Sequence, residues 1–169
     1  MSRRDDEAAA GGDDARARVA RAIESAGPGR LLGKGHPVGD FLEAHAWRLL
    51  ERRPGYLRLD VHLPDHVRNA RGVLFGGFTA TYVDLVAVHT VRAGEPRGAP
   101  RPWLATVNLR VDYLEPVSEA RFEIESEVVS RRGRISLVQT RFRDATGRLL
   151  VFALTTISET ARPEDDTKR

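Results

Sequence analysis

The sequence contains no cysteine, which excludes disulfides, thiolate nucleophiles and cysteine-ligated metals. It also has no run of about 18 uncharged apolar residues, the length that a membrane-spanning helix needs, because Asp84 interrupts the best candidate. No apolar run follows the charged first residues, so no signal peptide is expected. We therefore expect a cytoplasmic protein that does not contact a membrane.

The sequence also lacks a large excess of charge of one sign. The chain has 27 basic and 24 acidic residues, a net charge of +3. No basic run is interleaved with aromatic residues, so we expect no nucleic-acid partner. The five histidines show no metal-ligand spacing, and we expect neither a metal site nor a cofactor.

The length of 169 residues suits one domain with a real core. We predict three parts: a partly disordered N-terminal extension over 1–36, a folded domain over 37–158, and a disordered tail over 159–169. Two helices are expected before the first strand. One covers 14–26, and Asp40 caps the other, which carries an apolar stripe at helical spacing: Phe41, Ala44, Trp47 and Leu50.

Strand patterns dominate the rest of the chain. Apolar residues alternate with period two over 56–63, which predicts a half-buried strand. Four more strand-like segments cover 104–115, 120–130, 135–144 and 149–157, and turn signals at Gly133 and Gly147 predict hairpins. We expect these four to form an antiparallel meander, with Val107 and Leu109 on one face of its first strand.

A long apolar helix is predicted between these strands, over 76–92. It is apolar almost all round, so the sheet must wrap it or another subunit must cover it. A curled antiparallel sheet around one central helix is a hotdog fold. The fold class is therefore α+β, a hotdog domain with extra N-terminal helices.

Asp84 is the one formally charged residue between Gly72 and Val91. A buried carboxylate without partners costs several kcal/mol or is forced to take up a proton. A chain rarely keeps such a residue for packing alone, which makes Asp84 the first candidate for function. The structural alternative is a carboxylate bound by nearby hydroxyls, such as those of Thr79, Thr81 and Tyr82.

Residues 69–84 read NARGVLFGGFTATYVD, and residues 106–116 read TVNLRVDYLEP. The first run resembles the signature of PaaI-like acyl-CoA thioesterases, Asn-x-x-Gly-x-x-His-Gly-Gly followed by an acidic residue on the helix. The second resembles the next strand of that family, which commonly ends in Tyr-x-x-Pro. The resemblance covers residues 56–157.

The resemblance implies hydrolysis of an acyl-CoA thioester to a free acid and coenzyme A. Asp84 would act as general base or as nucleophile, and backbone N–H groups at Gly76 and Gly77 would stabilise the oxyanion. Asn69 would orient the acyl group or the water, and Thr106 would hold the lytic water. In this family the site lies between two subunits, so a homodimer or a homotetramer is expected.

One position departs from the family pattern. The histidine before the two glycines is Phe75 here. Phe75 could pack under the acyl group and favour an apolar or aromatic substrate, or it could mark a slow member. The arginines of the 131–134 turn, Arg132 and Arg134 among them, could meet the phosphates of coenzyme A, or they could simply be solvated.

Two other functions remain open at this point. Phe75 supports a non-catalytic protein that binds or senses acyl-CoA. A hotdog hydratase or dehydratase also uses an acidic residue near a helix, but it pairs that residue with a histidine.

Overall fold

The computed structural model describes residues 14–15, 17–95 and 102–160. Residues 17–24 are helical, as the sequence predicts. The elements that follow are α2 (Pro37–Phe41), η1 (Ala44–Ala46), β1 (Arg48–Arg53), β2 (Tyr56–His62), η2 (Asp65–Val67), α3 (Gly76–Val91), β3 (Trp103–Tyr113), β4 (Arg121–Arg132), β5 (Ile135–Arg143) and β6 (Leu149–Thr160). Residues 1–13 and 161–169, where disorder is expected, lie outside the described residues. Residues 159–160 of the expected disordered tail instead belong to β6.

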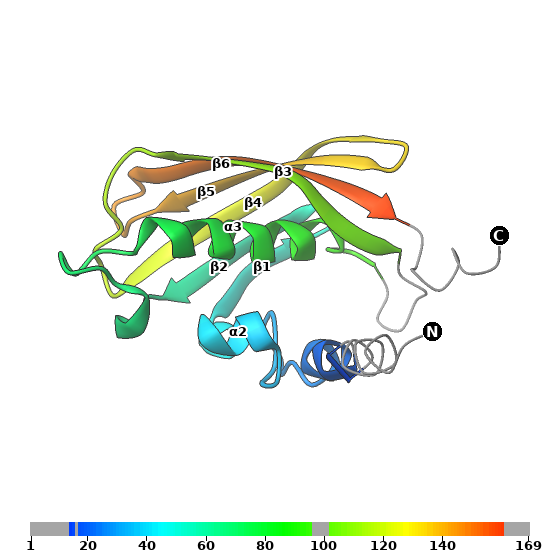
Figure 1. The fold of residues 1–169 in the computed structure, drawn as a ribbon, viewed down its shortest axis with the longest axis horizontal. Coiled ribbons are helices and arrows are strands. Elements are labelled where there is room, and N and C mark those ends of the chain that lie inside the picture. The colour runs from blue at the N-terminus through cyan, green and yellow to red at the C-terminus, as the bar shows by residue number, and fades with distance from the viewer. Residues whose placement is uncertain (1–13, 16, 96–101, 161–169) are drawn as a thin grey trace, which may run out of the picture.

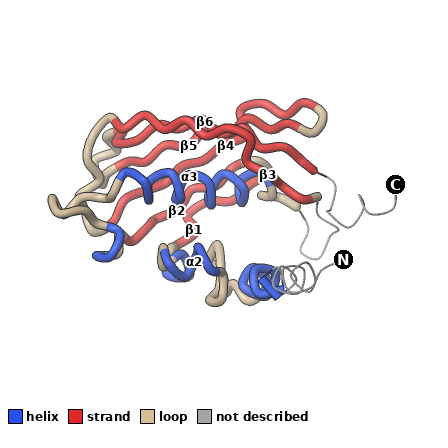
Figure 2. The backbone as a smooth tube through the Cα atoms, viewed as in Figure 1, coloured by secondary structure: helices blue, strands red, loops and turns tan. Residues whose placement is uncertain are grey.

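The six strands form one antiparallel sheet in the order β1-β2-β4-β5-β6-β3. The sheet curls over α3, which runs along its inner face (Figure 1). This arrangement confirms the α+β hotdog fold with additional N-terminal helices. Figure 2 shows α3 as one uninterrupted helix beside the strands.

The predicted four-strand meander is wrong in one respect. β4, β5 and β6 are joined by hairpins, but β3 pairs with β6 instead of β4. The chain therefore crosses from one edge of the sheet towards its middle between β3 and β4. As a result β6 is an interior strand, in agreement with its apolar sequence, and β3 is an edge strand.

The core lies between α3 and the inner face of the sheet. Trp47 and Tyr82 are fully buried, and their rings stack with centroids 5.3 Å apart. Phe122 and Phe142 place their rings edge-on against Tyr82. Burial raises the pKa of Tyr82, because the phenolate would lose its hydration in this apolar surrounding. The aromatic cluster fixes the middle of α3 against the sheet.

The helix predicted to start at Asp40 is wrong. α2 ends at Phe41, and Asp40 accepts hydrogen bonds from the N–H of Gly35 instead of capping a following helix. Glu43 then takes a left-handed conformation, with φ of 53°, which stops helical propagation. Residues 48–53 form β1, a charged edge strand that pairs with β2.

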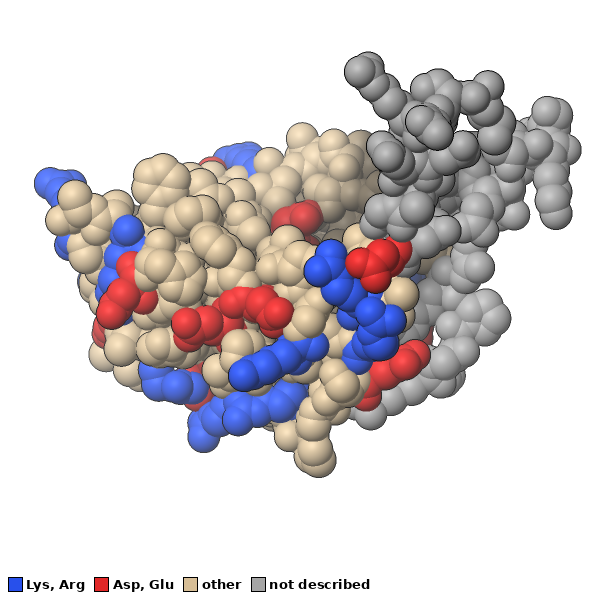
Figure 3. All heavy atoms as spheres, turned by 60° about the horizontal axis from the view of Figure 1, so that its bottom comes forward, with Lys and Arg blue, Asp and Glu red and all other residues tan. Residues whose placement is uncertain are grey.

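Figure 3 shows one face of the molecule, where basic and acidic side chains are intermixed without a continuous field of one sign. No helix in the described part of the chain is long and apolar enough to cross a membrane. The same residues hold no group of three or more potential metal ligands.

Candidate active site

The half-buried Asp84 lies in the middle of α3, and its partner comes from β3. Thr106 donates its hydroxyl proton to Asp84 Oδ1 over 2.5 Å. The predicted alternative, a carboxylate bound by hydroxyls of its own helix, is wrong. Thr79 and Thr81 instead donate to main-chain carbonyls, those of Phe75 and Gly77. The hydrogen bond to Thr106 is charge-assisted and therefore strong for its kind.

An irregularity in β3 accompanies this contact. Thr106 pairs with Ile157 and Asn108 pairs with Thr156, so Val107 is an extra residue in the ladder. Val107 is 63% exposed and does not share the buried face with Leu109, contrary to the sequence prediction. Such bulges re-aim side chains and are over-represented next to active sites.

The N-terminal end of α3 carries the two glycines. Phe75 is the N-cap and supplies no side-chain hydrogen bond, while its carbonyl accepts from the N–H groups of Phe78 and Thr79. The N–H groups of Gly76 and Gly77 precede these and lie at the positive end of the helix dipole. This end of the helix can stabilise an oxyanion.

Each glycine at the helix start has a ring beside it. A Cβ added to Gly77 would lie 2.9 Å from Phe75 Cε1, so the missing side chain leaves room for the Phe75 ring. A Cβ added to Gly76 would meet the Tyr113 ring at 3.7 Å, an ordinary contact. Tyr113 also donates its phenol hydrogen to the Gly76 carbonyl over 2.8 Å. The sequence contains Tyr113 in its Tyr-x-x-Pro motif, but nothing in the pattern predicts this contact.

Phe75 is half exposed and belongs to a row of aromatic rings on the surface. Its ring meets Phe78 edge-on at 5.5 Å, and Phe78 meets Phe41 edge-on at 5.1 Å. This chain therefore has an apolar surface at the helix start, at the position where the PaaI-like signature that it resembles has a histidine.

Asn69 organises the loop that leads into α3. Its side-chain oxygen accepts from the N–H groups of Arg71 and Val73, and its carbonyl accepts from Gly72. Gly72 has φ of 76°, which explains a glycine at this turn. Within one chain, the contacts of Asn69 therefore shape the approach to Gly76.

Arg132 and Arg134 lie far from the helix start. They belong to the β4–β5 hairpin, and their neighbour Arg131 donates to the carbonyl of Val91, at the other end of α3. Arg134 donates through Nε to the main-chain oxygen of Glu159 over 2.7 Å, and Arg132 is exposed. The structure thus brings Asp84 and Thr106 together and leaves the arginines and Gly76 at opposite ends of α3.

Residues 71–151 match the family model described as the thioesterase superfamily. The chain is 28% identical over 102 residues to the protein named "Putative esterase SSO1253" of Saccharolobus solfataricus, a match that covers 60% of this chain and 65% of that relative.

The fold of this chain recurs in solved structures. One is a "Thioesterase family protein" from Silicibacter pomeroyi, with a TM-score of 0.64, 19% identity, and coverage of 75% of this chain and 90% of that one. Another is a "Hypothetical Thioesterase Protein with Coenzyme A" from Streptococcus pneumoniae TIGR4, with a TM-score of 0.61, 17% identity, and coverage of 69% and 87%. The pneumococcal protein was also crystallised with alanine in place of an aspartate or of a threonine.

Proposed function

We propose that this protein is a PaaI-like thioesterase that hydrolyses acyl-CoA to a free acid and coenzyme A. The observation that carries the proposal is the hydrogen bond from Thr106 to Asp84, which lies on a helix whose first two residues are glycines. A carboxylate held in this way can take a proton from water, and the helix start can receive the thioester oxygen. The coenzyme A seen with the pneumococcal relative supports this substrate class.

In the general-base route, Asp84 takes a proton from water as the water oxygen bonds to the thioester carbonyl carbon. The carbonyl oxygen becomes an oxyanion that faces the N–H groups of Gly76 and Gly77. When the oxyanion collapses, the carbon–sulfur bond breaks and the proton passes to the thiolate. In the nucleophile route, Asp84 attacks the carbonyl carbon itself, and water then hydrolyses the mixed anhydride.

The reaction needs two copies of this chain. Asp84 follows Gly76 by eight residues, which places them about 12 Å apart along one helix. Reacting atoms must approach to roughly 3–3.5 Å, so these two groups cannot act on one thioester within a single chain. In the proposed dimer, Asp84 of one copy serves a thioester held at Gly76 and Gly77 of the other copy, with Asn69 beside them.

The surface around Asp84 suits such a partner. Ala80, Asp84 and Val88 are only partly buried and share one face of α3. The neighbouring strand β3 has one free edge within the described sheet, where Trp103 and Val107 are exposed. A second copy would cover both features.

The test is thiol release from a panel of aliphatic and aromatic acyl-CoAs. Wild type should release thiol, and Asp84→Asn should reduce the rate by about 10² to 10⁴. Asp112→Asn is the matched control, because Asp112 is a carboxylate on β3, the strand of Thr106, and it accepts hydrogen bonds from Arg110. Binding of acyl-CoA without any thiol release would instead favour the non-catalytic function, which the apolar Phe75 supports. Release that persists in Asp84→Asn would overturn the mechanism.

A further inference from the structure

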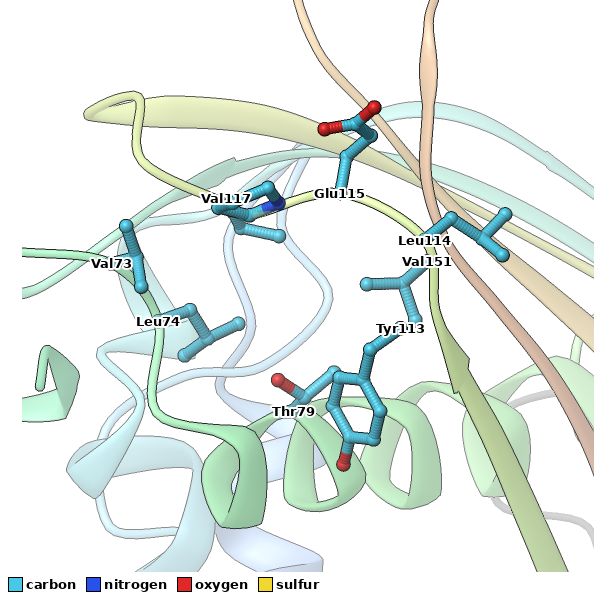
Figure 4. Close-up of a pocket in the computed structure, with 9 residues that line it drawn as sticks. Val73, Leu74, Thr79, Tyr113, Leu114, Glu115, Val117 and Val151 are labelled. Carbon is cyan, nitrogen blue, oxygen red and sulfur yellow. The ribbon is translucent and has the colours of Figure 1, made fainter.

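A cavity of about 280 Å³ opens beside the first turns of α3 (Figure 4). Apolar side chains make up most of its wall: Val73, Leu74, Leu114, Val117 and Val151. Glu115 supplies the one carboxylate of the lining, and in Figure 4 this group points away from Thr79 and Tyr113. Thr79 donates its hydroxyl to the Phe75 carbonyl, so the interior of the cavity presents mainly apolar surface.

Tyr113 joins this cavity to the start of the helix. Its ring forms part of the cavity wall, and the same ring packs beside the bare Cα of Gly76. Its hydroxyl donates to the carbonyl of Gly76, the first residue of α3. Tyr113 is therefore in contact both with the cavity and with Gly76, the residue proposed to hold the oxyanion.

We infer that this cavity binds the acyl group of the substrate and that Tyr113 limits the size of that group. The inference rests on the proposed thioester hydrolysis and names its substrate class. Pockets for drug-sized ligands enclose roughly 300–1,000 Å³, so a cavity of about 280 Å³ suits a compact acyl group. The preferred substrates are thus thioesters of short apolar chains or of acids with one aromatic ring.

Tyr113 has a second, separable role as a positioning residue. Its hydroxyl fixes the direction of the first peptide of α3, and with it the N–H of Gly77. The ring sets the length of the acyl group, whereas the hydroxyl sets the geometry of the oxyanion. Two substitutions separate these roles, because phenylalanine keeps the ring and alanine removes both.

The experiment measures kcat and KM over a series of acyl-CoAs from acetyl to hexadecanoyl, with phenylacetyl-CoA included. Tyr113→Ala should shift the preference toward longer chains by at least about tenfold, the selectivity typical of one or more methylenes. Tyr113→Phe should lower kcat about fivefold for every substrate, as expected for one lost hydrogen bond, and leave the chain-length optimum unchanged. Tyr56→Phe is the matched control, because it removes a phenol that bonds Glu125 on another part of the sheet.

A binding measurement separates this inference from the proposed function. S-hexyl coenzyme A, a thioether that cannot be hydrolysed, should shift the methyl NMR signals of Leu114, Val117 and Val151, and free coenzyme A should not. If wild type releases thiol but Tyr113→Ala has an unchanged chain-length profile, the proposed hydrolysis stands and the role of Tyr113 in the acyl site is overturned. Methyl shifts without thiol release from any substrate would keep the acyl site and overturn hydrolysis. Equal shifts with free coenzyme A, or none with the thioether, would overturn the acyl site.

Discussion

Thr106 on β3 donates a hydrogen bond to Asp84 on α3 over 2.5 Å. The bulge at Val107 makes this contact possible. With strict alternation outward from Leu109, Val107 would face the helix and Thr106 would face away. The extra residue at Val107 reverses the alternation of side chains in the part of β3 that precedes it. Thr106, instead of Val107, therefore points towards α3 and reaches the Asp84 carboxylate.

Thr106→Val should lower kcat by about tenfold or more, because the hydroxyl is a donor to an ionised group and valine has none. Thr106→Ser keeps the donor and should remain within about threefold of wild type. Steady-state kinetics with one good acyl-CoA substrate measures both. Equal activity of the valine and serine variants would show that the bond is structural only.

The sequence predicts those helices and strands that are buried either on one face or on all sides. β2 and β4 alternate apolar and polar residues because one face of each lies on the core, and α3 is apolar because the sheet surrounds it. β1 was missed, since an edge strand with mostly exposed residues has no apolar face to reveal it. The partner of β3 was missed as well, because antiparallel pairing between distant segments leaves no local pattern.

The site was accessible only in part. Asp84 was conspicuous because a charge in an apolar helix is costly, and the resemblance pointed to Thr106. Tyr113 could not be assigned a role, because its contact with Gly76 depends on the position of β3 across α3. The separation of the arginines from the glycines was equally invisible in the sequence, because it depends on which end of α3 the β4–β5 hairpin approaches.

Phe75→His should raise turnover severalfold and preserve the fold. The phenyl ring is half exposed and touches Phe78 by its edge, so a smaller ring fits the same space. A histidine would add a polar contact at the helix start, near the expected thioester oxygen. Kinetics and thermal unfolding of the variant give the answer. A fall in turnover at unchanged stability would indicate that the phenyl ring contacts the acyl group.

Stability should fall as the pH drops below about 6.5 because of His36. Its Nδ1 accepts a hydrogen bond from the N–H of Gly39 and so caps α2 in the unprotonated form. Burial lowers the pKa of His36 from its ordinary value of 6.5, against the opposing effect of Asp40. As the pH falls, His36 therefore takes up a proton in the unfolded chain before it does so in the folded one. The contribution of the His36 cap to the free energy of unfolding is present above pH 6.5 and lost as the pH falls through the lowered pKa.

Urea unfolding at several pH values between about 7.5 and 5 measures this effect. His36→Ala should be less stable at neutral pH, since it loses the cap, and should show a flatter pH profile. His62→Gln, on β2, is the control for the loss of a histidine outside the α2 cap. A profile in His36→Ala as steep as that of wild type would refute the role of His36.

If each site is built from two copies of the chain, two variants that are inactive alone should regain activity when they form a mixed dimer. Asp84→Ala removes the carboxylate. Gly76→Val places methyl groups in front of the helix start. The nearest neighbour of its Cβ is the Tyr113 ring, at an ordinary distance of 3.7 Å, so the fold should tolerate the change. A mixed dimer then contains one site with both defects and one intact site. Random mixing should give about a quarter of wild-type activity, because half of the dimers are mixed and half of their sites are intact.

Differently tagged chains, co-expressed and purified through both tags, allow a direct measurement of kcat per mixed dimer. Co-expression of Asp84→Ala with Asp84→Asn is the control and should restore nothing, since no site regains its carboxylate. If verified Asp84→Ala and Gly76→Val dimers also stay inactive, the two groups do not act across the interface, and the two-chain site is refuted.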